Sequence, residues 1–221
     1  MIDCGADWLR KLRAVAPTAI ILTHAHPDHA YGLSHGADCP VYATAETRAL
    51  LSHYPINDWR PVEPRRRFSL GSVKFEAFPV EHSLRAPAVG YRVSYGRGAF
   101  FYVPDVARIA ERSDALRAVD LYVGDGASLT RSMTRRRDNV LIGHAAVRAQ
   151  LEWCEQEAVT HVIFTHCGSG IVKSDLREVA ARLRDMGEER GIDARFAYDG
   201  LRLRLTKGKA AERRGCQASA Q

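Results

Sequence analysis

The 221-residue chain lacks the features that mark secreted disulfide-bonded proteins, cysteine-based zinc sites and membrane proteins. Its five cysteines are odd in number, widely spaced and without a Cys-x-x-Cys pair, so neither a disulfide framework nor a cysteine zinc knuckle is indicated. No apolar run approaches the roughly 20 residues of a membrane span. Residues 1–5 carry no basic and then apolar leader. These absences predict a cytoplasmic protein with reduced thiols and no membrane attachment.

The sequence motifs of two large enzyme classes are also missing. There is no Gly-x-Ser-x-Gly elbow and no Walker-type loop, so serine hydrolases and P-loop nucleotide-binding proteins are excluded. The length favours one domain, which we place at residues 1–205. Residues 206–221 hold four of the lysines and arginines against one glutamate, and we expect a disordered basic tail there. The rest of the chain carries only about half of the net charge of +6, a mild preference for anionic partners.

Hydrophobic patterning predicts a sheet-rich α/β fold. Apolar or alternating runs predict strands at 19–23, 41–43, 73–80, 88–95, 99–103, 121–123 and 162–165. Helices are expected at 7–15, 45–52, 145–157 and 175–189, the last capped by Ser174. Two final strands, 196–198 and 201–205, are expected to pair around a turn at Asp199–Gly200. Strands come first and alternate with helices afterwards, which indicates a sheet core with helices outside.

The strongest motif directly follows the first expected strand. Four side chains able to bind metal fall within six residues there: His24, His26, Asp28 and His29. Imidazole suits zinc, iron or copper, and a carboxylate adds a harder oxygen ligand. A chance surface cluster is the competing interpretation, but this cluster is internal, follows an apolar strand and contains an acid. Alternate residues of an extended chain share a face, whereas the pair after Pro27 faces elsewhere, so two adjacent metals explain the spacing better than one.

Three further candidates each follow an expected strand: His82, Asp105 and His166. The ends of strands at one edge of a sheet are where an α/β protein gathers the side chains of its site. Taken singly, a packed histidine or a loop aspartate is the simpler interpretation of each. Together with the first cluster, their common position favours a shared metal site. The other histidines, His35, His53 and His161, match no motif, and we interpret Cys167 as a small packed side chain.

This set of motifs resembles the metallo-β-lactamase superfamily of binuclear metallohydrolases. The resemblance rests on His-x-His-x-Asp-His after a strand, then a lone histidine, a lone aspartate and a Thr-His, and it runs from Ile2 to about Leu205. An aspartate at position 105 is unlike the zinc β-lactamases, which have cysteine there. Gly143-His144-Ala-Ala-Val-Arg is similar to a segment of the ribonuclease Z and cyclic phosphodiesterase branch. The interval of 23 residues from His82 to Asp105 also suits phosphodiesterases of phosphonate catabolism.

The resemblance implies a metallo-β-lactamase-type αββα sandwich, lacking here the opening N-terminal strands that usually precede the Ile-Asp-Cys-Gly strand. It implies two divalent ions, with zinc expected first and manganese or iron as alternatives. One ion would be held by His24, His26 and His82, the other by Asp28, His29 and His166, and Asp105 would bridge them. Two such cations activate a bridging water, and the resulting hydroxide attacks the substrate. Asp3 is a candidate for orienting a ligand histidine, although a local capping role explains it equally well.

The same resemblance makes Asp28 and His144 the catalytic candidates. We predict that His144 is not a metal ligand and acts as general acid on the leaving group, because Gly143-His144 is expected to open the helix before the His166 strand. A histidine that merely caps or packs is the alternative. The preferred function is a phosphodiesterase acting on a small-molecule or nucleic-acid phosphodiester. Arg131 and the run 135–137 lie where they could meet phosphate oxygens, although a solvated charged face explains such a run as well.

Two other functions remain open from the sequence. The same water could attack a carboxylic ester, a thioester or a lactone. Alternatively, the protein binds metal or nucleic acid and catalyses no reaction. Ribonuclease Z enzymes often carry a long arm that grips transfer RNA, and the interval between Asp105 and His144 has no room for one. This makes transfer RNA a less favoured substrate, and the sequence leaves a homodimer open.

Overall fold

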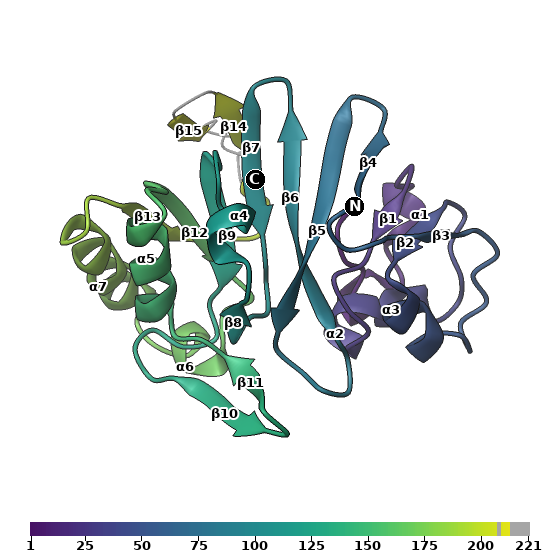
Figure 1. Ribbon diagram of the computed structural model, residues 1–221, viewed down its shortest axis with the longest axis horizontal. Helices are drawn as coiled ribbons and strands as arrows, with labels where there is room; N and C mark the ends of the chain where they lie inside the picture. The colour runs from purple at the N-terminus through teal and green to yellow at the C-terminus, as the bar shows by residue number, and fades with distance from the viewer. Residues whose placement is uncertain (207–208, 213–221) are drawn as a thin grey trace, which may run out of the picture.

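A computed structural model describes residues 1–206 and 209–212, in which two main β-sheets pack face to face with helices on their outer sides (Figure 1) and two further strand pairs lie apart from them. The larger sheet has the strand order β13-β12-β9-β7-β6-β5-β4, with β8 beside β5. Its strands are β4 (Arg67–Leu70), β5 (Val73–Glu81), β6 (Ala88–Tyr95), β7 (Gly98–Tyr102), β8 (Arg108–Ile109), β9 (Leu121–Asp125), β12 (His161–Thr165) and β13 (Asp193–Phe196). The strands from β4 to β7 are antiparallel, and those from β7 to β13 are parallel.

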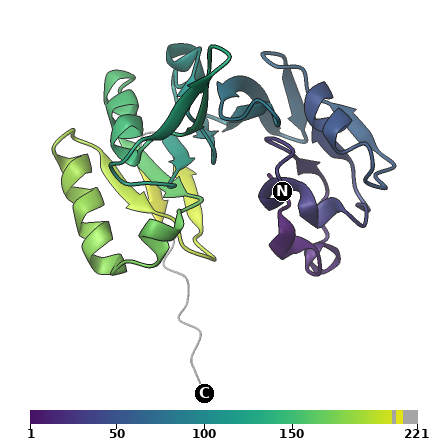
Figure 2. The ribbon, with the colours of Figure 1, turned by 90° about the horizontal axis from the view of Figure 1, so that it is seen from below.

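The smaller sheet lies in the N-terminal half and is parallel. It consists of β1 (Ile20–Ile21), β2 (Val41–Ala43) and β3 (Trp59–Pro61), and Ile2 bridges to Ile21 at its edge. Short helical segments accompany it: η1 (Ala6–Trp8), α1 (Leu12–Val15), α2 (Pro27–Ala30), η2 (Tyr31–Leu33) and α3 (Ala45–Leu50). The larger sheet is accompanied by α4 (Arg112–Ala115), α5 (Val147–Gln156), α6 (Ser169–Val172) and α7 (Leu176–Glu188). Figure 2 shows the purple N-terminal segments and the green helices α5 and α7 on opposite sides of the molecule.

Alternation along the strands produces three hydrophobic cores. Ile20 packs with the N-terminal helices, whereas the next residue, Ile21, packs between the two sheets. In β5, Phe75 faces the smaller sheet and Phe78 belongs to the core under α5 and α7. Successive side chains of a strand point to opposite faces, so each sheet is covered on both sides. The result is the αββα order that the family resemblance implied.

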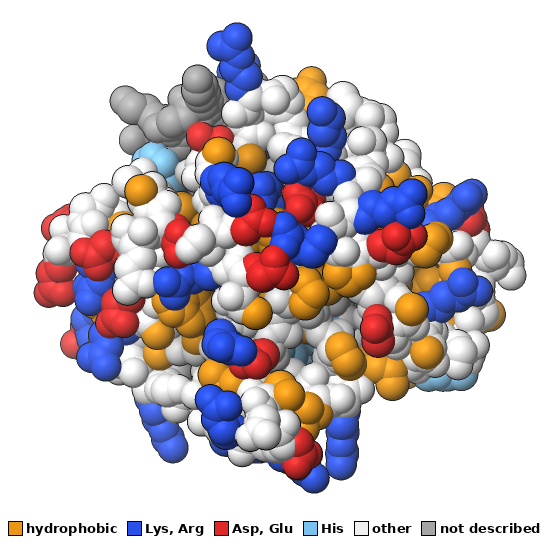
Figure 3. Space-filling model, in the orientation of Figure 1, with side chains coloured by type: hydrophobic (Ala, Val, Ile, Leu, Met, Phe, Trp, Pro, Cys, Tyr) orange, Lys and Arg blue, Asp and Glu red, His pale blue; other side chains and the backbone are white. Residues whose placement is uncertain are grey.

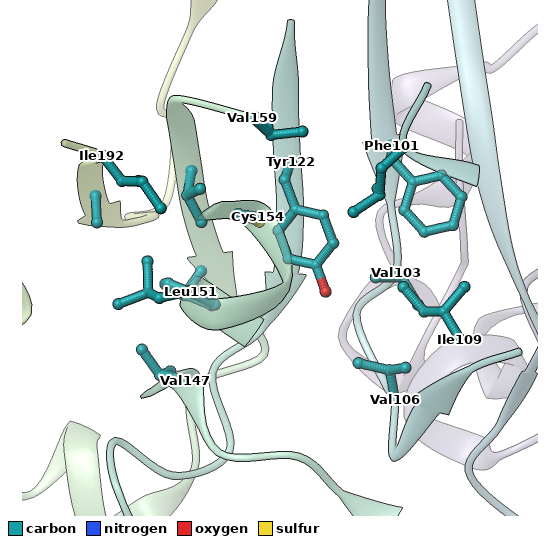
Figure 4. Packing of buried hydrophobic residues seen from close by; sticks show 14 of the residues in the cluster. Phe101, Val103, Val106, Ile109, Tyr122, Val147, Leu151, Cys154, Val159 and Ile192 are labelled. Carbon is teal, nitrogen blue, oxygen red and sulfur yellow. The ribbon is translucent and has the colours of Figure 1, made fainter. Parts of the chain in front are cut away.

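The largest of these cores fixes the C-terminal half. Tyr122 of β9 is fully buried between side chains of α5, among them Leu151 and Cys154, and Phe101 of β7 (Figure 4). Its hydroxyl donates to Gln150 Oε1 at 2.9 Å, so no buried polar group is left unpaired there. This packing fixes the position of α5 against β7, β9 and β12. The loops that follow these strands carry the candidate site.

Most expected strands are present within one or two residues, but several local predictions are wrong. His144 does not open a helix: it ends β11 (Val140–His144), which pairs with β10 (Met133–Arg137), and α5 begins only at Val147. Helix α7 is capped by Asp175, whose carboxylate accepts from the Arg177 amide at 2.8 Å, and not by Ser174. The segment 7–15 forms two short pieces, η1 and α1, and not the single helix that was expected. A helix this short has little stability of its own in water, so local packing decides where it forms.

The end of the chain also differs from expectation. Phe196 belongs to β13, which pairs in parallel with β12, and not to a hairpin with residues 201–205. That second segment contributes instead to β14 (Leu203–Thr206), which pairs with β15 (Lys209–Glu212). Of the expected tail, residues 207–208 and 213–221 lie outside the described residues. None of the helices in the described part of the chain has the length and apolar character needed to cross a bilayer.

Candidate metal centre

The candidate residues lie on loops that leave the ends of β1, β5, β7 and β12. His26 is the N-cap of α2, and Pro27 occupies the first turn, where its fixed φ favours helix and its missing N–H costs nothing. The turn directs Asp28 and His29 away from the extended residues before it. The extended segment supplies His24 and His26 to one group of side chains, and the turn supplies Asp28 and His29 to a second, adjacent group.

The structure brings all seven sequence-predicted side chains together in two overlapping groups. In each group the potential ligand atoms lie within 4.8 Å of one another. The first group contains His24, His26, His82 and Asp105, and the second contains Asp28, His29, Asp105 and His166. Asp105 belongs to both groups, as the resemblance implied for a bridging residue.

The Asp105 carboxylate is the centre of this arrangement. Its Oδ2 lies 3.3 Å from His24 Nε2, 3.2 Å from His29 Nε2 and 3.4 Å from His82 Nε2. Its Oδ1 lies 2.9 Å from His166 Nδ1. On the open side, Asp28 Oδ2 lies 3.0 Å from His166 Nε2. The carboxylate of Asp105 is 2% exposed and that of Asp28 is 55% exposed, so solvent reaches the centre beside Asp28.

Hydrogen bonds behind the histidines set which ring nitrogen faces the centre. His29 Nδ1 donates to Asp3 Oδ2 at 2.9 Å, and His82 Nδ1 donates to the Gly143 carbonyl at 3.1 Å. His24 Nδ1 lies 3.0 Å from the Thr23 hydroxyl, which itself donates to Asp3. Each contact places a proton on Nδ1 and turns Nε2 toward the centre. Asp3 therefore contacts one candidate ligand directly and a second through Thr23.

The buried polar atoms of this cluster are better satisfied by a metal ion than by hydrogen bonds to one another. His29 Nε2, Asp105 Oδ1 and His166 Nδ1 are buried atoms whose contacts within the cluster, at 2.9 to 3.2 Å, are poorly aligned for hydrogen bonds. Buried polar atoms are nearly always paired, and each unpaired one costs free energy. Inward-facing imidazole nitrogens and carboxylate oxygens are the donor set that zinc, manganese and iron accept. These three atoms belong to residues of the second group, so a divalent ion held by that group would satisfy them.

In this cluster, burial and neighbouring charges shift the pKa values of the side chains in opposite directions. Burial by itself would lower the pKa of His29, but hydrogen bonds with Asp105 and Asp3 outweigh it and raise the pKa to about 10. The hydrogen bond with Asp105 also raises the pKa of His166 to about 9. Burial lowers the pKa of His82 to about 4. Burial would raise the pKa of Asp105, but its histidine partners hold it far below the usual range. Without metal, protons on His29 and His166 balance the buried carboxylate.

His144 borders the centre from the end of β11. Its Nδ1 lies 2.8 Å from Asp125 Oδ2 and 3.8 Å from Asp105 Oδ1. Its ring centroid is 4.9 Å from that of His82 and 6.2 Å from that of His166. The hydrogen bond to Asp125 is the main cause that raises the pKa of His144. His144 thus presents Nε2 on the side away from Asp125, and its side chain is 23% exposed.

Asp125 is the site residue that the sequence analysis missed. It is fully buried, ends β9, and accepts hydrogen bonds from the Val106 and Ala127 amides as well as from His144. Burial raises its pKa despite these contacts. A third group of potential ligands, made of Asp105, Asp125, His144 and His166, includes it. Its position at the end of an expected strand, the same signal that singled out Asp105, would have identified it.

The remaining candidates lie away from this centre or at its edge. His35 and His53 are exposed, and His161 Nδ1 lies 3.5 Å from Asp193 at the opposite end of β12. Burial raises the pKa of Cys167 to about 11, so its thiol is not a ready nucleophile. The arginine run 135–137 lies exposed on β10, and Arg131 precedes that strand.

A family model described as "Beta-lactamase superfamily domain" matches residues 1–167, most of the chain and all seven candidate ligands. The chain belongs to the β-lactamase superfamily. It has the αββα fold and a cluster of histidines and aspartates suited to holding divalent metal. A search of characterised proteins finds the ribonuclease Z of Methanopyrus kandleri, 29% identical over 110 residues. That match covers 42% of this chain and 39% of that enzyme.

Solved structures of superfamily members share the fold. A diphosphatase of the PhnP family is 24% identical, with a TM-score of 0.67, and the match covers 90% of this chain and 76% of that one. The metallo-β-lactamase fold protein YhfI from Bacillus subtilis is 15% identical, with a TM-score of 0.65, over 96% and 85% of the two chains. Human tRNase Z, short form, is 17% identical, with a TM-score of 0.53, over 76% and 82%. At these identities the likeness concerns the fold.

Proposed function

We propose that this protein is a binuclear metal-dependent phosphodiesterase. The observation that carries the proposal is the position of Asp105, which belongs to both groups of potential ligands: its Oδ2 lies beside His24, His29 and His82, and its Oδ1 lies beside His166. We assign His24, His26 and His82 to one ion, Asp28, His29 and His166 to the other, and Asp105 to both. The mixed nitrogen and oxygen donors favour zinc, with manganese or iron as alternatives.

Two divalent ions held there would supply an activated water and neutralise the charge that develops on phosphate oxygens. The chain supplies the rest. Asp28, at the solvent-exposed edge, orients His166 through the 3.0 Å contact. His144 is not assigned to a metal. Its Nε2, held in place by the Asp125 contact at Nδ1, donates a proton to the departing oxygen.

Phosphodiesters are preferred to carbonyl esters because of two relatives. The ribonuclease Z and the PhnP-family diphosphatase bear names that describe phosphoryl chemistry, and both share sequence or fold with this chain. We therefore propose a small-molecule or nucleic-acid phosphodiester as substrate. Four described cysteines are free thiols, which supports the proposal of a cytoplasmic location. Formation of a homodimer, which the sequence left open, stays a proposal.

The test combines metal analysis with a substrate panel. We expect two ions per chain by elemental analysis, and hydrolysis of bis(p-nitrophenyl) phosphate in the presence of zinc or manganese. A thioester and a lactone serve as the carbonyl substrates. Faster turnover of either one would identify a carbonyl hydrolase, and no turnover despite bound metal would identify a binding protein. At most one ion per chain would contradict the binuclear centre.

A further inference from the structure

A pocket of about 590 Å³ opens directly beside the candidate metal centre. His144 and His166 form its inner wall, Arg131 contributes from the loop after β9, and Arg182 contributes from α7. The lining includes the hydroxyl-bearing residues Ser128, Thr130, Ser169 and Ser174, and no aspartate or glutamate among the described residues. A cationic, hydroxyl-lined pocket of this kind suits an anionic group.

Both arginines are free to bind a ligand. Among the described residues, neither Arg131 nor Arg182 forms an ion pair, and both are exposed. Several other arginines are paired, as Arg65 is with Glu111 and Arg112 with Glu157. Figure 3 shows this mixture, with basic and acidic side chains next to one another over much of one face. Two unpaired guanidinium groups in one pocket can each meet phosphate oxygens with two parallel hydrogen bonds.

The opposite side of the centre has the reverse charge. A pocket of about 390 Å³ there is lined by Asp3, Asp7 and Asp28, with Trp8 and Tyr102. His166 borders both pockets. An additional negative charge on the substrate would meet two guanidinium groups on the arginine side and no arginine or lysine among the described lining residues of the other pocket. The charge distribution therefore favours one orientation of a substrate that carries a second anionic group.

We propose that the pocket of Arg131 and Arg182 binds a second phosphate of the substrate, next to the phosphodiester that is hydrolysed. This inference rests on the proposed function and narrows it to substrates with at least two phosphates. The second phosphate belongs either to a small phosphorylated molecule or to the next linkage of a polynucleotide. The two sources share one chemistry in the pocket and differ in what lies beyond it.

The β10–β11 hairpin separates these two sources. Met133 pairs with His144 and Arg135 with Ile142, so Arg135 and Arg137 lie on the same face of the hairpin as His144. Successive positions on that face are about 6.6 Å apart, at roughly 3.3 Å per residue. Basic side chains project at the lower edge of Figure 3, where Figure 1 places the hairpin. A polynucleotide would reach these arginines, whereas a small molecule would end in the pocket.

The test compares two substrates that differ by one phosphate. Thymidine 5′-(p-nitrophenyl phosphate) carries only the reacting diester, and its 3′-phosphorylated derivative carries a second phosphate. With the metal-loaded enzyme, we expect the second phosphate to lower KM about tenfold, the effect of one or two charge-assisted hydrogen bonds, with little change in kcat. Arg131→Gln combined with Arg182→Gln should abolish this difference. Arg184→Gln, an exposed arginine of the same helix outside the pocket, should preserve it.

Failure of this inference and failure of the proposed function give different results. If the wild type hydrolyses both substrates with equal KM, or if the double variant keeps the tenfold difference, the pocket does not bind the second phosphate. Hydrolysis of neither substrate by the two-metal protein would refute the phosphodiesterase itself. Metal content of the double variant, measured in parallel, should equal that of the wild type. A loss of metal would show that the arginines support the centre and would overturn the binding role.

A third substrate, a thymidine trinucleotide with a 5′-p-nitrophenyl ester, identifies the source of the second phosphate. Arg135→Gln with Arg137→Gln should raise its KM about tenfold if the natural substrate is a polynucleotide, and leave the 3′-phosphorylated mononucleotide unchanged. Equal KM values for the trinucleotide in wild type and hairpin variant assign the pocket to a small phosphorylated molecule. Either result supports the pocket, provided that the pocket variant loses its preference. Retention of the preference in that variant overturns it for both sources.

Discussion

The carboxylate of Asp105 lies within 3.4 Å of four imidazole nitrogens, two of which are protonated when no metal is present. Such a residue cannot be replaced without leaving buried cations unpaired, so a variant at this position would confound stability with function. Asp28 is the better probe, because it is half exposed and belongs to the four-residue helix α2.

Asp28→Ala should therefore cost activity far more than stability. We expect a loss of at least 100-fold in kcat/KM, a change in the free energy of unfolding of under about 1 kcal/mol for an exposed position, and one ion lost per chain. The measurements are steady-state kinetics, urea unfolding and elemental analysis. Asp38→Ala, at another exposed aspartate outside the centre, is the control and should change none of the three. An Asp28→Ala protein with two ions and normal turnover would show that the ligand assignment is wrong.

His144→Ala should affect substrates according to their leaving group. A general acid typically contributes about 10²–10⁴-fold, but a nitrophenolate departs readily without a proton. The variant should lose most of its activity on a dinucleotide and much less on a nitrophenyl diester, with two ions still bound. Asp125→Asn, which removes the charge that positions His144, should show the same pattern more weakly. Equal losses on both substrates would reduce His144 to a binding role, and loss of an ion would make it a ligand.

At the scale of elements, the β10–β11 hairpin positions two site histidines through one glycine. The Gly143 amide donates to the His82 carbonyl at 2.8 Å, and its own carbonyl accepts from His82 Nδ1. Gly143 has φ of +103°, and an added Cβ would lie 2.1 Å from the Met133 carbonyl oxygen. Only glycine fits this conformation and this close approach.

Gly143→Ala should consequently destabilise the protein and damage the site together. We expect a loss of about 3 kcal/mol, the upper end for a strained backbone position, and a loss of the first metal site because His82 shifts. Gly71→Ala is the matched control: its φ is also positive, at +57°, but nothing lies within 4 Å of the added Cβ. It should lose only about 1 kcal/mol and keep both ions. Thermal unfolding and metal analysis of both variants test this prediction. Equal losses of stability and of metal in the two variants would contradict the role of Gly143.

Buried elements could be predicted from the sequence, whereas exposed ones could not. Strands such as β5 and β6 were predicted because their buried side chains alternate or cluster. The sequence of β10, Met-Thr-Arg-Arg-Arg, is exposed along most of its length and has no such pattern, so only its pairing with β11 defines it. The same holds for the partner of β13, which depends on the long α7 crossover and not on local turn residues. The metal ligands were predictable because residue type and strand ends indicated them; Asp125 carries the same signal at the end of β9, but its role of positioning His144 is seen only in their contact.

At the scale of the whole molecule, the charge balance of the centre predicts how stability responds to pH in the absence of metal. The pKa of His29 is raised to about 10 in the folded state from an ordinary value of 6.5, and that of His166 to about 9. Protons bound more tightly by the folded chain stabilise it fully below pH 6.5, and this contribution is lost as the pH rises through the folded pKa values. The metal-free protein should therefore become less stable between pH 6.5 and 9.

Urea unfolding with a chelator present, at several pH values in this range, tests the prediction. His29→Gln should remove much of the pH dependence, whereas His53→Gln, at an exposed histidine away from the centre, should keep it. The metal-loaded protein should show the opposite trend in affinity, because deprotonated imidazoles bind divalent ions more tightly. Stability of the metal-free wild type that is constant or rises with pH would contradict the assigned charge states.

The wide spacing of the ligands along the chain has a consequence for biosynthesis. Four of the seven residues fall between positions 24 and 29, yet the set is complete only at His166. A nascent chain therefore exposes an incomplete cluster of histidines until most of the protein has left the ribosome, since domains emerge and fold from the N-terminus. In the proposed binuclear centre, binding of both ions requires that the segment with His166 has docked onto the N-terminal half. Metal binding at this centre would therefore report that the chain has been translated and folded beyond His166.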